Sequence, residues 1–218
     1  LMQSSLRGLD LAGADLSEAN LREADAKGVD LSGANLAGAD LRRAELEHAV
    51  LDGADVSGAR LVASDLEKAS VQGADFRRSD LRRIDLNEAR IDGSDLAQTD
   101  LRSALLRRVA AREADFTNAR MGEIDLERAD LSGARLDGAD LMRADLDRAV
   151  LVGASLRDAD LSAASLSSAD LMDADLAGAT LDGANLRAAN LSGANLSGAR
   201  GLRQDQLDRA CGDERTRL

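Results

Sequence analysis

The sequence predicts a solenoid, in which short coils stack along one axis and each coil buries its apolar side chains against its neighbours. A large apolar residue returns at every fifth position from Leu6 to Leu196, and only Ala26 and Ala111 break this pattern. A period of five matches neither the helical repeat of about 3.6 residues nor the strand repeat of 2. The chain therefore has to turn once in every five-residue unit.

The size of one coil follows from the glycines. Glycine occupies a column that repeats every twenty residues and is interrupted only by Glu113 and Asp173. The glycines of this column are Gly13, Gly33, Gly53, Gly73, Gly93, Gly133, Gly153 and Gly193. Four five-residue units therefore make one four-sided coil. The third residue of a type II turn needs a positive φ, which glycine adopts readily, so we expect this corner column to consist mostly of type II turns.

The interior of the stack is expected to contain leucine and alanine. Two positions before each large apolar residue lies a small residue, usually alanine, and Asp or Asn lies between the two. Near the beginning, Ala26 is preceded at the small position by Ala24, which predicts a small void there. Ala111 is instead preceded by Val109, which predicts that the two positions exchange volume within one unit.

Residues 6 to 200, which keep this unit without a frame shift, resemble the pentapeptide repeat family. The resemblance implies an all-β fold, a right-handed four-sided β-helix with about ten coils of twenty residues. It also implies that the central Leu or Phe and the preceding Ala point into the coil, while the Asp or Asn and the two following residues point outward.

The regular pattern stops after Arg200, which divides the chain into a pentapeptide-repeat β-helix at 1–200 and a C-terminal cap or tail at 201–218. An open end of a solenoid exposes unpaired backbone and apolar side chains, so a cap is expected. Residues 204–211 suit a short helix. In some members of the family such a cap forms a dimer, so a homodimer through this end is one expectation. The side chains expected to contact the last coil are Leu202, Leu207 and Cys211.

Residues 101–113 allow two interpretations. Leu101, Leu105 and Val109 have the i, i+4, i+8 spacing of a helix, which would bulge from the rod. A degenerate coil is favoured, because the five-residue frame continues on both sides. In either case Leu105 and Ala110 stand where Asp is usual, which predicts a small apolar patch on the surface.

The net charge of −12 and the pI near 4.6 argue against a nonspecific nucleic-acid binder, which would carry a basic face. One outward column carries acidic residues at the spacing of one coil, and such a stack invites a cation or a basic partner. The alternative, which we favour, is that each carboxylate is solvated or bonded to the backbone of its own turn. This candidate acidic column consists of Asp55, Asp75, Asp95 and Asp115.

Arginines cluster in the middle of the chain. A solvated face that pairs with neighbouring carboxylates is the ordinary explanation of such a cluster. The alternative is a docking site on an otherwise acidic rod. The residues of this candidate basic patch are Arg77, Arg78, Arg82, Arg83, Arg107, Arg108 and Arg112, with Arg102 between them.

Catalysis and cofactor binding find no support in the sequence. The only histidine, His48, and the only cysteine, Cys211, lie at opposite ends, so they form no catalytic pair and no His/Cys metal cluster. Phosphate-binding glycine motifs and calcium repeats are missing. A single cysteine excludes an internal disulfide and fits the cytoplasm. We expect no cofactor, no secretory signal and no membrane span.

Two functions of different classes remain. The first is a non-enzymatic scaffold that binds a protein partner along the solenoid surface. The second comes from the resemblance, because the family includes quinolone-resistance and self-protection proteins that engage DNA gyrase. In that case outward carboxylates of the acidic column would stand in for DNA phosphates. Direct nucleic-acid binding is not expected, and an enzyme is the least favoured class.

Overall fold

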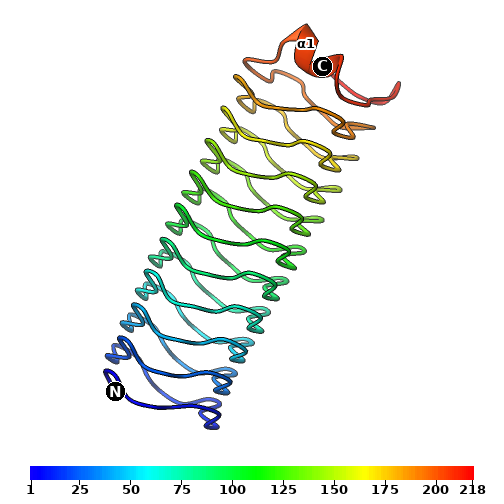
Figure 1. Ribbon diagram of the computed structural model, residues 1–218. Coiled ribbons are helices and arrows are strands. Elements are labelled where there is room, and N and C mark those ends of the chain that lie inside the picture. Colours follow the sequence, from blue (N-terminus) through cyan, green and yellow to red (C-terminus); the bar gives the residue numbers. More distant parts are fainter.

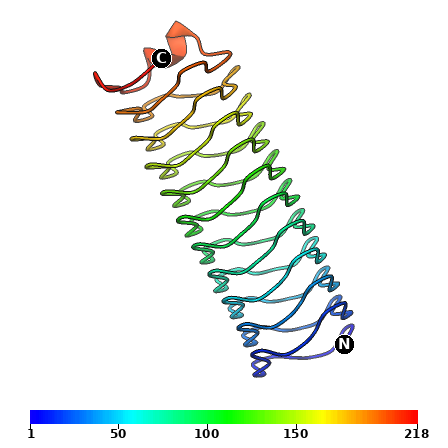
Figure 2. The ribbon, with the colours of Figure 1, turned by 180° about the vertical axis from the view of Figure 1, so that it is seen from behind.

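The computed structural model describes residues 1–218 and shows a straight rod of stacked coils, with the two termini at opposite ends (Figures 1 and 2). Each side of a coil contributes one residue to a parallel bridge with the residue twenty positions later, from Ser5 with Asp25 to Thr180 with Arg200. The one helix is α1, Gln204–Leu207. No helix has the length and the apolar character that crossing a membrane would require.

Backbone hydrogen bonds join each coil to the next along the rod axis. The Leu36 N–H donates to the carbonyl of Asp55 at 2.7 Å, and the Asp55 N–H donates to the carbonyl of Ala34 at 3.0 Å. A third bond, from Gly38 N–H to the Ser57 carbonyl at 2.9 Å, links the corners. The same three bonds recur from unit to unit, so the twenty-residue coil predicted from the glycines is what the backbone forms.

Every corner of the stack has a positive φ at the third residue of its turn. The predicted glycine column follows this pattern, with a φ of 65° at Gly93, as type II geometry requires. The other corners share this conformation. Over the whole chain, twenty-four residues with positive φ are not glycine and carry a Cβ, for example Arg78 at 61° and Ser103 at 56°. The inter-coil hydrogen bonds hold these residues in a conformation that costs roughly 1 kcal/mol or more each.

The core is one continuous column of leucine and alanine side chains along the whole rod. The large side chains, including Phe76 and Phe116, point inward together with the small residue two positions earlier. Where Ser or Thr replaces that alanine, its hydroxyl donates to a backbone carbonyl: Ser64 donates to Leu61, three residues earlier, at 2.7 Å, whereas Ser94 donates to Val71 of the preceding coil at 2.6 Å. No buried hydroxyl of this kind is therefore left without a partner, which keeps the substitution compatible with the core.

The two exceptions to the leucine pattern, Ala26 and Ala111, both lie in the core. An apolar cavity of about 10 Å³ lies against Ala24 and Ala26, and leucines of the neighbouring coils complete its wall. The predicted void near Ala26 is thus confirmed. Val109 and Ala111 are both fully buried, with exposed fractions of 1% and 0%, so both face the core.

Residues 101–113 form a regular coil, and the helical bulge is not present. Leu101 and Val109 are buried at the large and small inward positions. Leu105 occupies an outward bridge between Asp85 and Asp125 and is 40% exposed, so the apolar surface position predicted there is confirmed.

The C-terminal segment differs from the expected helix. The helix α1 ends at Leu207, and the chain then returns to the stack, where the Cys211 N–H donates to Ala189 O at 2.8 Å. Leu202 and Leu207 are partly buried against the core, but the predicted contact of the Cys211 side chain is wrong, because that side chain is exposed. The unpaired edge of the last coil offers more hydrogen bonds than a further turn of a short, marginal helix would form.

Candidate partner-binding surface

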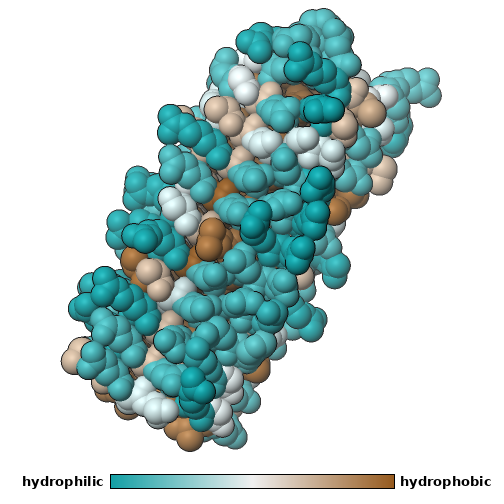
Figure 3. All heavy atoms as spheres, in the orientation of Figure 1, coloured by the Kyte–Doolittle hydropathy of each residue, from teal (hydrophilic) through white to brown (hydrophobic).

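The outward residues of the rod form columns that repeat every twenty residues, and these columns carry the charged side chains. The space-filling view shows a mostly hydrophilic surface with small apolar areas between polar side chains (Figure 3). No group of three or more His, Cys, Asp or Glu side chains could hold a metal ion. Any function of this surface therefore has to come from the pattern of its charges and hollows.

The candidate acidic column is engaged with its own turns. Each carboxylate accepts a hydrogen bond from the backbone N–H two residues later, at 2.8 Å from Thr117 to Asp115 and 2.9 Å from Arg77 to Asp75. The Arg77 guanidinium also pairs with Asp75 at 2.5 Å and Asp95 at 3.5 Å. Its hydrogen bond lowers the pKa of Asp75. Asp55 accepts from Ser57 in the same way, so the structure agrees with the turn-bonded alternative.

The arginines of the candidate basic patch are not brought together, because they are distributed around all four sides of the rod. Arg77 pairs with Asp75, Arg107 with Asp125 and Glu127, Arg108 with Glu88, and Arg112 with Asp130. Their proximity in sequence reflects successive corners, each of which faces another direction. Arg78 and Arg83 make no ion pair within 4.0 Å, and Arg83 lines one hollow together with Arg82 and Arg102 on one side of the rod.

Five arginines on that side form ion pairs with three aspartates, and we call this group the arginine face. The carboxylates lie beneath the guanidinium groups in a ladder of ion pairs. Arg82 bridges Asp80 at 2.6 Å and Asp100 at 4.0 Å. Asp100 also pairs with Arg102 at 2.6 Å and with Arg120 at 3.6 Å. The arginine face comprises Arg42, Arg60, Arg82, Arg102 and Arg120 with Asp40, Asp80 and Asp100.

The arginine face presents positive charge to the outside. The side chain of Asp40 is 13% exposed and that of Asp100 is 19% exposed, whereas the arginine side chains range from 38% for Arg42 to 59% for Arg120. The hydrogen bond from Arg42 lowers the pKa of Asp40. Burial raises the pKa of Asp100, but the bonds from Arg102 outweigh it and the net shift is downward. Both carboxylates are therefore ionised at neutral pH, and the outermost groups are guanidiniums.

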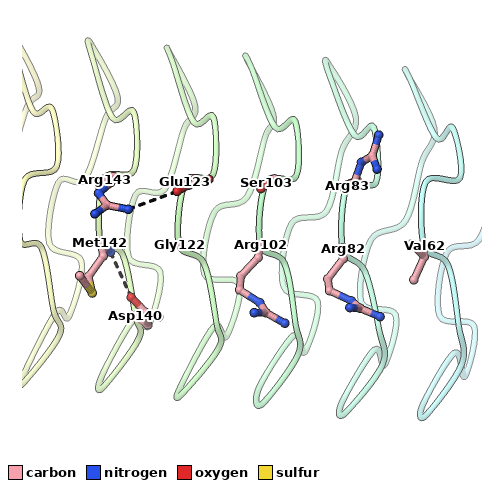
Figure 4. A pocket seen from close by; sticks show the side chains of 10 residues that line it. All are labelled: Val62, Arg82, Arg83, Arg102, Ser103, Gly122, Glu123, Asp140, Met142 and Arg143. Atoms are coloured by element: carbon pink, nitrogen blue, oxygen red, sulfur yellow. Dashed lines mark hydrogen bonds and ion pairs between the residues drawn. The ribbon is translucent and has the colours of Figure 1, made fainter.

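A hollow of about 590 Å³ lies at the corner beside the arginine face (Figure 4). Its floor is the bare backbone of Gly122, between the side chains of Arg102 and Met142 in the next coils. Arg143 reaches over to Glu123 at 3.4 Å along the opposite edge. The remaining lining residues are Val62, Arg82, Arg83, Ser103 and Asp140.

The adjacent side is strongly acidic, and we call it the acidic face. Burial raises the pKa of Asp65, and the charges of Glu47, Asp85 and Glu67 add to this effect. Part of the charge is neutralised, because Lys27 bridges Glu45 at 3.1 Å and Glu47 at 2.5 Å. The acidic face comprises Glu45, Glu47, Asp65, Glu67, Asp85, Asp125, Glu127, Asp145 and Asp147.

Sequence reasoning missed most of these residues. Clustering along the chain selected arginines of successive corners, whereas the arginine face is built from residues twenty apart. Writing the sequence in rows of twenty would have placed Arg42, Arg82 and Arg102 in one column and Arg60 and Arg120 in another. The sequence also contained an indication of the hollow at Gly122. This glycine lies at the second position of its turn, whereas the other glycines of the repeats lie at the third.

A family model described as pentapeptide repeats, in eight copies, matches residues 1–38, 30–67, 69–108, 112–148, 139–176 and 169–200. The chain belongs to the pentapeptide repeat family. Proteins of this family are generally structural or interaction proteins. The stack of coils is accordingly a right-handed β-helix.

The solved structure of HetL, a pentapeptide repeat protein involved in heterocyst differentiation regulation in the cyanobacterium Nostoc sp. strain PCC 7120, is 36% identical to this chain. The match covers 88% of this chain and 89% of HetL, with a TM-score of 0.52. QnrB1, a plasmid-mediated fluoroquinolone resistance protein, is 19% identical over 85% of this chain and 87% of its own, with a TM-score of 0.45. The comparison with curated proteins found no match.

Proposed function

We propose that this protein is a non-enzymatic scaffold whose β-helix, residues 1–200, binds a protein partner along one side of the rod, with residues 201–218 as its cap. The observation that carries the proposal is the difference between two adjacent sides. The arginine face holds five arginines over three aspartates, while the acidic face beside it is dominated by carboxylates. Complementary potentials of this kind select a partner and set its orientation.

The architecture supports binding rather than catalysis. The large apolar side chains are used along the axis of the rod, so its outward positions are free to carry charge. His48 lies at an exposed corner and Cys211 in the exposed tail, and neither has a titratable partner within hydrogen-bond reach. Acid–base catalysis needs groups arranged in a site that excludes water, and the hollows of this surface are open.

The experiment is site-specific photocrosslinking in cells of the source organism. Four exposed corners encircle the rod once, and each would carry a benzophenone amino acid in turn: Gln98, Ser103, Arg108 and Glu113. A scaffold that uses one side gives a discrete crosslinked protein from one or two adjacent corners. Crosslinks of equal yield from all four corners, or none from any corner, would contradict the proposal.

A second candidate is a DNA mimic that binds DNA gyrase, and the acidic face is the observation that favours it. Its carboxylates recur in successive coils on either side of Leu105, and Glu47, Glu67 and Asp85 lie close enough to Asp65 to add to the effect of burial in raising its pKa. Purified protein should then alter gyrase supercoiling, and the double variant Asp65→Asn, Asp85→Asn should lose that effect. A folded protein that leaves supercoiling unchanged at micromolar concentration eliminates this candidate.

A further inference from the structure

Gly122 occupies a position where the backbone has no need of glycine. Within the coils every other glycine has a positive φ, whereas Gly122 stands at the second position of its turn and does not. A Cβ built there would have its nearest neighbours at 3.9 to 4.0 Å, which is ordinary contact. Glycine costs conformational entropy, and here that cost is not offset by turn geometry or by lack of space. Its effect on the molecule is to leave the hollow open.

The hollow offers apolar contact together with a net positive charge, because four arginines line it against the two carboxylates of Glu123 and Asp140. Met142 is 40% exposed on one side of Gly122, and the stem of Arg102 forms the other side. Arginine stems provide apolar surface while their guanidiniums stay at the rim. The head group of Arg102 is held by Asp100 at 2.6 Å, and the next guanidinium of the ladder, that of Arg82, lies one coil away, roughly 4.8 Å along the axis. The rim is therefore fixed in position before a partner arrives, which reduces the entropy lost on binding.

The charge of this surface selects an acidic partner. Arg83 lines the hollow without any ion pair within 4.0 Å, so one guanidinium there is available for a new carboxylate. Nucleic acid is also anionic, but the chain carries a net charge of −12 and the side next to the arginine face is acidic, which opposes a long polyanion that reaches both sides. A short acidic segment can remain on the arginine face, since charges further away than about 10 Å are screened at 0.1 M salt.

We propose that the arginine face and the hollow at Gly122 dock an acidic protein segment, whose carboxylates pair with the guanidiniums and whose apolar side chain enters the hollow against Met142. This inference rests on the proposed scaffold function and names the surface and the chemistry of the partner. Arginine and an apolar anchor are the residues on which interface energies typically concentrate.

The test measures fluorescence anisotropy of a labelled nonapeptide, EDEDLEDED, with the full-length protein at 0.1 M salt. Replacing Gly122 by Met fills the hollow without a change in charge and should weaken binding about tenfold or more. The double variant Arg82→Ala, Arg102→Ala should weaken it at least as much. Replacing the central leucine of the peptide by glycine should remove most of the difference between wild type and the Gly122→Met variant.

The matched control is the double variant Arg128→Ala, Arg148→Ala, which removes two arginines at the same one-coil spacing from another corner. Both of these arginines pair with a carboxylate, that of Glu127, at 3.5 Å. Each double variant therefore removes two paired positive charges. Binding should stay within about twofold of wild type. Equal weakening by both double variants would reveal a general charge effect and overturn the inference, as would tighter binding of a labelled DNA duplex than of the peptide.

The outcomes separate this inference from the scaffold function. If photocrosslinking yields a partner but neither the Gly122→Met variant nor the Arg82→Ala, Arg102→Ala variant reduces its capture, the docking surface is wrong and the scaffold function stands. If crosslinking yields no partner, the scaffold function fails independently of the peptide result. Thermal unfolding followed by circular dichroism verifies that each variant is folded.

Discussion

The exceptions to the leucine pattern provide a sharp test of how the core is packed. Replacing Ala26 by leucine should stabilise the protein, whereas the same replacement at Ala111 should destabilise it. The two sites have the same residue at the same inward position, but a cavity of about 10 Å³ adjoins Ala26, while Val109 adds volume beside Ala111. One type of substitution thus has opposite expected signs at two sites of one fold.

The magnitude follows from the buried area. A leucine adds three carbon atoms to alanine, and each buried methylene contributes about 0.8 kcal/mol, which sets an upper limit of roughly 2.4 kcal/mol. One coil further, Leu46 with Ala44 already fills the equivalent space, so the backbone accommodates the side chain. The cavity is lined by apolar side chains only, so a leucine side chain there meets no polar group. After small shifts of the surrounding leucines, we expect Ala26→Leu to raise the free energy of unfolding by about 1 to 2 kcal/mol.

Urea denaturation followed by far-ultraviolet circular dichroism measures this change, because the chain contains no Trp or Tyr to report by fluorescence. The slope of the unfolding free energy against urea should stay constant, so that the midpoint alone reports stability. Hydrogen exchange should show slower opening of the first coils. Overpacking at Ala111→Leu should cost about 1 to 3 kcal/mol.

A double variant closes the thermodynamic cycle. Val109→Ala together with Ala111→Leu restores the common unit, so its stability should lie within about 1 kcal/mol of wild type and well above that of Ala111→Leu alone. The reasoning is refuted if Ala26→Leu is neutral or destabilising, or if Ala111→Leu is tolerated without the change at Val109.

Three further predictions concern turns, the cap and pH. Replacing Gly93, whose φ is 65°, by alanine should cost about 1 kcal/mol, whereas Gly122→Ala should stabilise by about 0.4 to 1 kcal/mol, both measured as urea midpoints. Replacing Gln206 by alanine leaves the carbonyls of Leu181 and Ala184 without its amide; exchange of amides in the last coil should accelerate, at a cost of about 1 to 3 kcal/mol, while the first coils stay unchanged. The pKa of Asp40 is lower in the folded protein than in the unfolded chain, where it is about 3.9. The Asp40 carboxylate therefore stabilises the fold fully above the pKa of the unfolded chain, and this stabilisation is lost as the pH falls through the pKa of the folded protein. The loss of stability caused by Asp40→Asn should therefore be larger at pH 7 than at pH 3, and an equal loss at both would disprove the ion pair with Arg42.

The sequence predicted the candidate surface only in part. It identified Arg82 and Arg83, because arginines cluster near them along the chain, but it joined them to Arg107 and Arg112, which face other sides. The acidic column was correctly expected to bond with its own turns, because an Asx side chain reaches the backbone two residues later whatever lies in the neighbouring coils. Ion pairs between coils could not be predicted from the sequence in the same way, because they depend on the direction in which a corner side chain extends.

By itself the sequence determined the twenty-residue coil, because glycines return at steps of twenty, and the composition of the core, because a large apolar residue returns every five residues. It also located the void at Ala26, since a missing side chain in a regular stack has no neighbour to replace it. Only the tertiary structure decided that turns without glycine share the positive φ, that Cys211 joins the ladder instead of a helix, and that Gly122 opens a hollow beside the arginine ladder. These features arise from hydrogen bonds and contacts between coils, and a coil acquires them only when its neighbours are in place.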